Sequence, residues 1–452
     1  MMEPNNSLIA KYNVAAPRYT SYPTVPFWES DVFSSAAWGQ RLKASYAEKK
    51  DDGISLYVHL PFCENLCTYC GCNTRITKNH RVEIPYISYI LQEWEMYKIL
   101  IDEDVIISEI HLGGGTPTFF EPANLQRLIL GLLDGAVVKD GASFSFEAHP
   151  ANTTKEHLLT LYNLGFRRLS LGIQDFDPNV QFLINRHQTV GDVQRVMDVA
   201  REIGYTSINF DLIYGLPLQT QNTVRDTIEK SLLMSPDRIS FYSYAHVPWI
   251  KPGQRRFTEQ DLPVGEAKLA LYILGKQMIE RKGYMDIGMD HFAQPEDALF
   301  KAALSGSLHR NFMGYADRYT PVLIGLGVSS ISDAWSSFAQ NVKKVEDYYK
   351  MLDEGRLPLI KGHLLHEEDE VLRRYILDMM CKGKVELKAE FSLNDAIVGR
   401  LRPLEGDGLV EFSNGNIHAT QIGKSFLRNI CMAFDQRLQL SKGKEQVFSQ
   451  AI

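Results

Sequence analysis

The stretch Tyr57–Thr74 reads YVHLPFCENLCTYCGCNT and holds four of the six cysteines of this 452-residue chain. Cys63, Cys67 and Cys70 have the spacing C-x3-C-x2-C, and Cys72 follows after one glycine. The segment before the cysteines is apolar and strand-like, and the segment after them is helix-like. The cysteines are therefore expected on a loop at the carboxyl end of a strand, where α/β enzymes hold their reactive groups.

Outward from this loop, strand-like and helix-like segments alternate from residue 54 to about residue 245. Such βα units predict a parallel sheet with right-handed crossovers. About six units is fewer than the eight of a closed barrel, so we expect an α/β fold built on a partial (β/α)6-type barrel. The expected strands are 54–60, 107–112, 143–148, 167–173, 207–213 and 238–244, and the expected helices are 83–100, 124–133, 154–164, 190–203 and 219–233.

The rest of the chain divides into an arm, an extension of the barrel and a C-terminal domain. Residues 1–50 are expected to form an N-terminal arm, since Pro17, Pro23 and Pro26 interrupt any regular helix there. Residues 51–345 form the barrel and its extension, and residues 346–452 a mainly helical, winged-helix-like domain. The expected elements outside the barrel are helices at 35–49, 266–282, 367–380, 393–401 and 422–439, loops at 289–293 and 309–312, and a hairpin at 408–420 with an Asn-Gly turn.

Composition excludes several classes of function. The formal net charge is −7, whereas a nucleic-acid-binding domain is usually basic, so we expect no nucleic-acid partner. No apolar run approaches the roughly 18–20 residues of a membrane span, and residues 1–17 lack the features of a signal peptide. Cys381 and Cys431 are isolated in the C-terminal part of the chain, so the cysteines do not form a disulfide framework. A reducing cytoplasmic location is expected.

Three kinds of site compete for the clustered thiols. A structural zinc site usually closes with four ligands from two separated arms, and no second paired arm follows here, although His59 or His80 could contribute. A redox C-x-x-C made of Cys67 and Cys70 would leave Cys63 unexplained. A [4Fe–4S] cluster held by three thiolates keeps one iron open for another ligand, and the C-x3-C-x2-C spacing fits this case best.

The longer motifs carry a resemblance to a known family. The string YVHLPFCENLCTYCGCN is preceded by PRYTSYP and followed, in order, by HLGGGTPT, GIQDF, NFDLIYGLP, GMDHFA, RNICMAFD and VFSQAI. C-x3-C-x2-C opening an α/β barrel resembles the radical S-adenosylmethionine (SAM) superfamily. The complete series resembles the oxygen-independent coproporphyrinogen III oxidase family from about Lys11 to the C-terminus.

This resemblance implies a function. The family decarboxylates two propionates of coproporphyrinogen III to vinyl groups and gives protoporphyrinogen IX for haem, through a 5′-deoxyadenosyl radical made from SAM. An alternative within the family is a radical-SAM-like haem chaperone without oxidase activity, but such relatives typically lack the fourth cysteine and the PRYTSYP arm. A zinc- or cluster-binding regulator is a third alternative, and the ordered motifs on every βα unit argue against it.

The resemblance also implies roles for individual residues. Cys63, Cys67 and Cys70 would bind one [4Fe–4S] cluster, and Cys72 would be a catalytic and cofactor-binding residue rather than a cluster ligand. Tyr57, Tyr69, Gly114, Gly115, Thr116 and Glu147 would contact SAM. Gln174, Arg186 and Asp211 would surround a second SAM, with apolar or backbone contacts from Ala245 and Ile331.

The substrate's four propionates call for cations, and the candidates are Arg18 and Arg310, although either could be an ordinary surface arginine. His59 and His291 could line the pocket or be structural. The implied partners are coproporphyrinogen III and an electron-donor protein such as flavodoxin or ferredoxin. A monomer is expected, with no membrane association.

Overall fold

The computed structural model describes residues 6–413, 415–441 and 448. Its centre is a sheet of twelve strands, and the strands expected in the barrel are parallel neighbours in it, which confirms the predicted partial barrel. A further strand, after residue 320, pairs in parallel with the first one. The parallel strands, in order across the sheet, are β13 (Val322–Leu326), β1 (Ile54–Leu60), β4 (Val105–Gly114), β5 (Ala136–Ala148), β6 (Phe166–Gln174), β7 (Ser207–Tyr214) and β8 (Arg238–Ser243).

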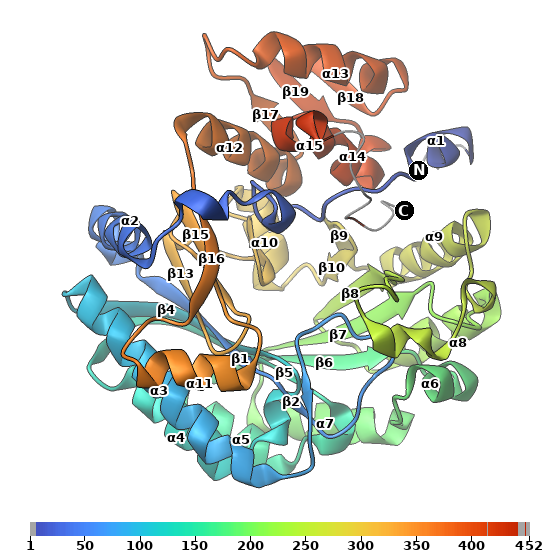
Figure 1. Ribbon diagram of the computed structural model, residues 1–452. Coiled ribbons are helices and arrows are strands. Elements are labelled where there is room, and N and C mark those ends of the chain that lie inside the picture. Colours follow the sequence, from blue (N-terminus) through green and yellow to red (C-terminus); the bar gives the residue numbers. More distant parts are fainter. Residues whose placement is uncertain (1–5, 414, 442–447, 449–452) are drawn as a thin grey trace.

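Helices cover the outer face of this sheet (Figure 1). Three of them begin with a threonine whose hydroxyl accepts a backbone N–H of the first turn, namely Thr154, Thr189 and Thr220, as expected for N-cap residues. The main core lies between these helices and the strands. The helices are α3 (Glu83–Ile101), α4 (Pro122–Leu133), α5 (Lys155–Asn163), α6 (Pro178–Ile184), α7 (Val190–Ile203), α8 (Gln221–Leu233) and α9 (Glu266–Arg281).

Antiparallel strands extend both edges of the sheet. β14 (Ile331–Asp333), β15 (Ser337–Asn341) and β16 (Leu359–Leu364) follow β13, and β10 (His291–Ala293) and β9 (Met285–Gly288) follow β8. The loops predicted at 289–293 and 309–312 are therefore wrong in part. The first contains β10, and the second contains β11 (His309–Asn311), which pairs with β12 (Gly314–Ala316). Strands of three residues are too short to show an alternating pattern.

Shorter elements complete the body. The cysteine loop holds a two-residue pairing of β2 (Phe62–Cys63) with β3 (Arg75–Ile76). Helix α10 (Ala298–Ser305) packs against β9, and α11 (Val345–Asp353) packs against α3. Short 3-10 helices lie at Val25–Phe27, Ser30–Val32, Lys50–Asp52, His80–Val82, Pro117–Phe119, Pro150–Asn152, Pro252–Arg256, Glu259–Asp261 and Gly423–Phe426.

The N-terminal arm runs between the barrel and the C-terminal domain (Figure 1). It contains α1 (Asn6–Tyr12) and α2 (Ser35–Glu48), and the proline-rich stretch between them has no α-helix, as predicted. Tyr19 is buried in the core of the C-terminal domain, and its hydroxyl donates to Asp435 over 3.1 Å. The arm is therefore packed along its length rather than free.

The C-terminal domain has the element order expected of a winged helix. α12 (Glu367–Lys382), β17 (Lys384–Glu386) and α13 (Asn394–Gly406) precede a hairpin of β18 (Val410–Ser413) and β19 (Asn416–Ala419), and β17 pairs with β19. Residue 414 of the expected Asn-Gly turn lies outside the described residues. So does the terminal motif VFSQAI at 447–452, except for Phe448.

The single helix predicted over residues 422–439 is wrong. The segment is divided into a 3-10 turn, α14 (Leu427–Met432) and α15 (Gln436–Leu440). The reason for the second break is Asp435, whose side chain accepts the N–H of Leu438 and so starts a new helix. The three-part division of the chain stays a prediction. The pairing of β16 with β15 argues for a boundary after Leu364 rather than at residue 345.

Candidate functional site

The predicted site residues meet at the carboxyl end of the parallel strands. One cavity of about 410 Å³ lies there, between the cysteine loop and the ends of β4, β5 and β6. Residues from seven separate parts of the chain reach it, as the βα topology predicts. The predicted residues that line it are Cys63, Cys67, Tyr69, Cys70, Cys72, Gly114, Gly115, Thr116, Glu147, Gln174, Arg186 and Asp211.

Each of the three expected ligand thiols has a polar neighbour. The sulfur of Cys63 lies 3.3 Å from the Thr116 hydroxyl, and burial raises the pKa of this thiol to about 12. The sulfur of Cys67 accepts from the Arg186 guanidinium over 3.8 Å. The sulfur of Cys70 accepts the backbone N–H of Cys72 over 3.4 Å, and a hydrogen bond from the Cys72 thiol lowers the pKa of Cys70 to about 6.

This donor set fits an iron–sulfur cluster better than a single metal ion. Among the described ranges, no group of three or more Cys, His, Asp or Glu side chains is arranged to hold one ion, whereas a zinc site needs its ligands to converge. In a cubane cluster each thiolate binds a different iron, so the thiols have to surround a space. Cys63, Cys67 and Cys70 all line one such space, the cavity.

The glycine-rich end of β4 closes one wall of the cavity. Gly114 has a φ of +111°, and a Cβ at Gly115 would lie 2.7 Å from the backbone of Pro61. The N–H groups of Gly115 and Thr116 donate to the carbonyls of Leu60 and Phe62 over 2.8 and 3.1 Å. Glycine permits both the backbone conformation and the close approach, and so holds β4 against the start of the cysteine loop.

Glu147 faces the cavity from β5. Its carboxylate accepts the N–H of Gly114 over 3.2 Å and lies 3.5 Å from Nε2 of His111. Burial alone would raise the pKa of Glu147, but the hydrogen bond and charge of His111 together with the Gly114 N–H lower it below its usual value. The carboxylate is therefore held ionised, ready to accept hydrogen bonds from an ammonium group.

A second polar group lies across the cavity, on β6, β7 and the end of α6. Arg186 is buried and donates to the carbonyl of Gly172, while its Nε is buried without a protein partner among the described residues. Asp211 accepts from Ser170 and Asn209 over 2.8 and 2.9 Å, and burial raises its pKa to about 6. An arginine with a spare donor beside a carboxylate suits a zwitterionic ligand such as an amino acid.

Three predicted contacts do not line the cavity. Tyr57 lies behind Glu147, with its hydroxyl 3.0 Å from Nδ1 of His59. The carbonyl of Ala245 accepts from the Gln254 amide, which also donates to the carbonyl of Tyr69. Ile331 pairs with Gln340 in the sheet extension. Their assignment to SAM stays a prediction.

The two arginines predicted for the substrate lie together. Arg18 donates to the carbonyl of Ser243 over 3.0 Å, and Arg310 donates to the carbonyl of Arg18 over 3.2 Å. Nε and Nη1 of Arg310 are buried without partners in the described part of the chain. Arg310 is thus a buried cation rather than an ordinary surface arginine.

The two histidines left open have different surroundings. His59 is hydrogen-bonded at both ring nitrogens, to Tyr57 and to the carbonyl of Asn73, which indicates a structural role. His291 bonds to the carbonyl of Met289 and, over 3.2 Å, to the hydroxyl of Tyr242. Burial lowers the pKa of His291 to about 4, so it is neutral near pH 7.

Sequence reasoning missed two residues at this site. Tyr242 lines the cavity from β8, and Lys251 donates to the carbonyl of Cys72 over 3.0 Å. The position of Tyr242 near the end of a predicted strand was the available signal. Lys251 has no such signal, since it lies in the long connection between β8 and α9.

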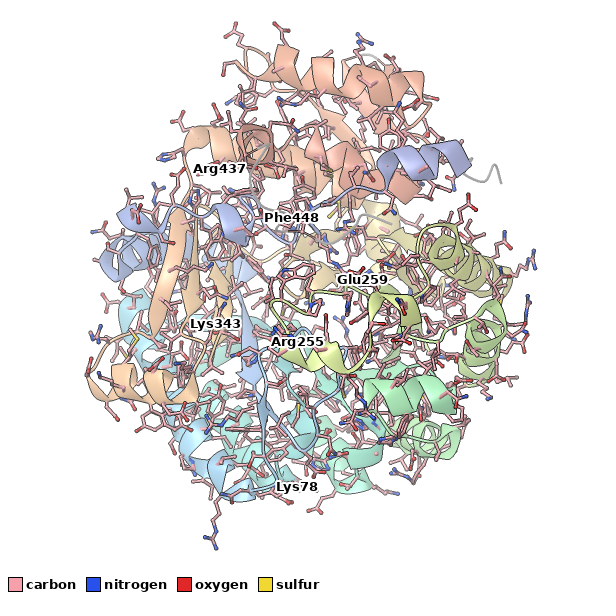
Figure 2. The ribbon with its side chains drawn as sticks, turned by 45° about the vertical axis from the view of Figure 1, so that its right-hand side comes forward. Lys78, Arg255, Glu259, Lys343, Arg437 and Phe448 are labelled. Atoms are coloured by element: carbon pink, nitrogen blue, oxygen red, sulfur yellow. The ribbon has the colours of Figure 1, made fainter. Side chains whose placement is uncertain are left out.

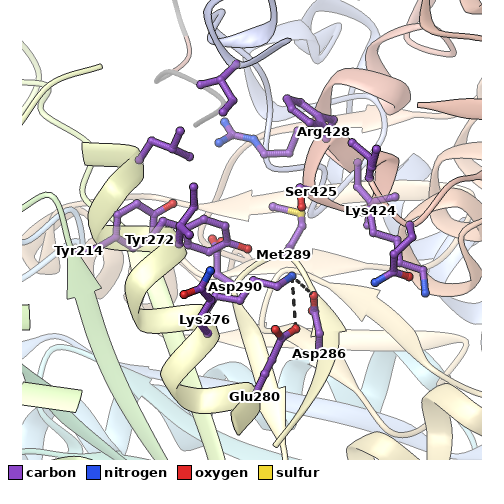
Figure 3. A pocket seen from close by; sticks show the side chains of 18 of the residues that line it. Tyr214, Tyr272, Lys276, Glu280, Asp286, Met289, Asp290, Lys424, Ser425 and Arg428 are labelled. Atoms are coloured by element: carbon purple, nitrogen blue, oxygen red, sulfur yellow. Dashed lines mark hydrogen bonds and ion pairs between the residues drawn. The ribbon is translucent and has the colours of Figure 1, made fainter. Parts of the chain in front are cut away.

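A separate cavity of about 480 Å³ lies between α9 and the C-terminal domain and contains none of the predicted residues. Figure 3 shows Lys276 at its wall, bonded to Asp286 over 2.5 Å and to Glu280 over 3.8 Å, with Tyr272 on the same helix, α9, and Met289 also lining the cavity. Within the described ranges, no helix is long and apolar enough to cross a membrane.

Known proteins are similar to this chain in sequence and in fold. Residues 57–230 match the radical SAM superfamily. The chain is 37% identical to the oxygen-independent coproporphyrinogen III oxidase of Synechocystis sp. over 98% of this chain and 97% of that protein. It is 38% identical to the protein of the same name from Escherichia coli (strain K12), over 99% of this chain and 98% of the relative. A solved structure of coproporphyrinogen III oxidase from Escherichia coli, described as a radical SAM enzyme, superimposes with a TM-score of 0.89 at 36% identity, covering 96% of this chain and 99% of that one.

Proposed function

The chain belongs to the oxygen-independent coproporphyrinogen III oxidase family, and on this premise we propose that it decarboxylates two propionate side chains of coproporphyrinogen III to vinyl groups. The product is protoporphyrinogen IX, formed without O2. The observation that carries the proposal is the single cavity that joins the three thiols to the polar ends of β4–β7. The alternative of a haem chaperone lacks support from the relatives, which carry the oxidase name.

Cys63, Cys67 and Cys70 would hold the [4Fe–4S] cluster, and the cavity beside them would hold SAM. Together the bound cluster and SAM supply one-electron chemistry that abstracts a hydrogen atom from an unactivated carbon. The protein's part is to hold and shield these groups. Glu147, kept ionised by His111 and the Gly114 N–H, would bind the ammonium group of SAM. The glycines at the end of β4 would let the ligand approach the backbone.

A second SAM is proposed beside the first. Arg186 would bind a carboxylate with the donor that has no protein partner, and Asp211 would accept ribose hydroxyls or an ammonium. Gln174 lies at the end of β6 with a φ of +69°, next to both. Ala245 and Ile331 would add backbone or apolar contacts.

The substrate side and the cellular context complete the proposal. Arg18 and Arg310 would pair with a propionate, since the spare donors of Arg310 suit a carboxylate. Cys72 would act in turnover rather than in cluster binding. We further propose a cytoplasmic monomer that receives electrons from a protein such as flavodoxin or ferredoxin.

An anaerobic assay tests the proposed function. The reconstituted protein is incubated with coproporphyrinogen III, SAM and dithionite, and the products are separated by chromatography. We expect a tricarboxylate intermediate followed by protoporphyrinogen IX. Tight haem binding without either product would support the chaperone alternative and overturn the proposal.

A further inference from the structure

The proposed reaction depends on single-electron transfer. Each reductive cleavage of SAM takes up one electron, and each decarboxylation releases one from the substrate, so the cluster needs a one-electron donor to begin turnover and the released electron needs an acceptor. A one-electron carrier from outside can serve both steps. An electron carrier has to approach the cluster closely, so its docking surface has to lie near the cysteine loop. This inference rests on the proposed function and names the surface that the carrier would use.

The cysteine loop lies at the surface beside exposed apolar side chains. Cys72 is exposed. The segment after β8 is tied to the loop, because Lys251 donates to the carbonyl of Cys72 and Gln254 to that of Tyr69, each over 3.0 Å. The end of α6 is tied to it as well, through Asn185 and the carbonyl of Leu66 over 2.8 Å. The exposed apolar residues on these segments are Leu66 (41%), Ile76 (43%), Phe182 (61%), Trp249 (61%) and Ile250 (60%). Leu66 and Ile76 also line the rim of the cavity.

Basic side chains surround this apolar patch. They belong to the loop itself, to the segment after β8 and to residues 343–344, where the carbonyl of Lys343 accepts from Asn73 over 2.9 Å. In Figure 2, Lys78, Arg255 and Lys343 lie around the loop, with Glu259 at one side. Within the described ranges none of these cations forms an ion pair with a carboxylate. The set is Lys78, Lys251, Arg255, Arg256, Lys343 and Lys344.

The charge of this face contrasts with that of the chain. The formal net charge is −7, yet the segments of this face carry the six cations named above against the carboxylates Glu64, Glu259, Asp261, Glu346 and Asp347. Of these, Glu346 pairs with Arg75 and also interacts with Lys344. A local basic patch on an acidic protein steers acidic partners to one face. Exposed tryptophan, phenylalanine and arginine are also the residue types enriched at protein interfaces.

We propose that this face docks a small acidic protein that carries single electrons. The interface would be small and rich in charge, as transient electron-transfer contacts are. One electron leaves the carrier's redox group, which is oxidised, and enters the cluster, which is reduced. No bond or proton is exchanged between the two proteins. Trp249 and Ile250 would form the apolar centre of the contact and the lysines its rim.

Binding measurements test the docking face directly. Flavodoxin, an acidic flavin carrier, is the probe, and its affinity for the holoenzyme is measured by biolayer interferometry at about 50 and 300 mM salt. The variant Lys78→Glu/Lys343→Glu is expected to bind about tenfold more weakly at the lower salt, and the difference should shrink at the higher salt because screening weakens exposed charges. Lys301→Glu, an exposed lysine of α10, is the matched control and should bind like the wild type.

Two outcomes would overturn the proposal that this face docks an acidic electron carrier. One is equal weakening by the control and the double variant. The other is equally tight binding of a basic cytochrome, since the sign of the charge would then not matter. A Trp249→Ala variant gives an independent check, with weaker binding expected at both salt concentrations.

A chemical reductant separates this inference from the proposed function. With dithionite in place of flavodoxin, the double variant should form product at the wild-type rate, because a small ion needs no docking face. If the wild type forms no product with dithionite, the proposed function fails, and the binding data still decide the docking face. If the variant loses activity with dithionite, the lysines support the site itself and the docking inference is wrong.

Discussion

The guanidinium of Arg186 donates through Nη1 to the sulfur of Cys67 over 3.8 Å. It also donates to the carbonyl of Gly172 at the end of β6. One buried side chain therefore connects the expected cluster ligand on the loop after β1 with the opposite wall of the cavity.

Arg186→Lys should weaken SAM binding. Lysine keeps the charge, but its single ammonium cannot reproduce the planar guanidinium fork that contacts Gly172 and Cys67 together. Loss of a charged hydrogen bond costs about 1.5–3 kcal/mol, so we expect affinity to fall about tenfold to a hundredfold. Calorimetry with SAM and the reconstituted protein measures this. Arg167→Lys, on a neighbouring part of β6 away from the cavity, is the control, and wild-type SAM affinity in Arg186→Lys would contradict the assigned role.

Gly115→Ala should displace the start of the cysteine loop. The new Cβ would lie 2.7 Å from the backbone carbon and oxygen of Pro61, which cannot rotate away as a side chain would. We expect lower iron content after reconstitution and weaker SAM binding. Gly399→Ala places its Cβ in open space within α13 and should leave both unchanged. Full iron incorporation in Gly115→Ala would show that the loop tolerates the shift.

Much of the barrel could be predicted from the sequence because its strands are long and buried. β1 has mostly buried residues, and the alternation of such strands with amphipathic helices defines the topology. The outer strands could not be predicted in this way. β14 has three residues, and its place in the sheet depends on pairing with β13 and β15, which no local pattern encodes.

The site could be predicted where a residue lies at a strand end or in the cysteine motif. Glu147 and Gln174 follow this rule. Tyr242, near the end of β8, follows it too, although it was not predicted. Lys251 does not, because its contribution depends on how a long connection folds back over the cysteines. The packing of Tyr19 against Asp435 is likewise a contact between the two ends of the chain that neither segment indicates alone.

SAM binding to the proposed second site, beside Arg186 and Asp211, should depend on pH through Asp211. Burial raises the pKa of this carboxyl to about 6, so it becomes protonated as the pH falls below 6 and can no longer accept two hydroxyl donors. We expect SAM affinity at this site to be about tenfold lower at pH 5 than at pH 7. At pH 5, one unit below the pKa, only about a tenth of the Asp211 carboxyl is ionised. Titration by calorimetry from pH 5 to 8 checks this, and Asp211→Asn should remove the dependence.

The raised pKa of Asp211 should also make the free energy of unfolding depend on pH. Its folded pKa of about 6 exceeds the ordinary value of 3.8, so between these values the folded state binds more protons than the unfolded state. The contribution of Asp211 to the free energy of unfolding therefore falls as the pH rises from 3.8 to 6 and is constant above it. Urea unfolding of the wild type and Asp211→Asn should show the variant gaining relative stability from pH 4 to pH 7. The opposite trend would mean that the carboxylate is stabilised in the fold.

Cys72→Ser should keep the cluster but lose turnover. The Cys72 thiol donates to the sulfur of Cys70, a bond that a serine hydroxyl can also donate. Two backbone contacts hold the residue as well, because its N–H donates to the sulfur of Cys70 and its carbonyl accepts from Lys251. Serine preserves both, so the loop should keep its shape and the three remaining thiols should still bind the cluster. Iron and sulfide analysis should therefore match the wild type, while product formation disappears. Cys381→Ser, at a partly buried residue that packs against the core of the C-terminal domain, should retain both properties. If Cys72→Ser loses iron while Cys381→Ser does not, Cys72 is a ligand, and the division of the four cysteines into three ligands and one reactive neighbour is wrong.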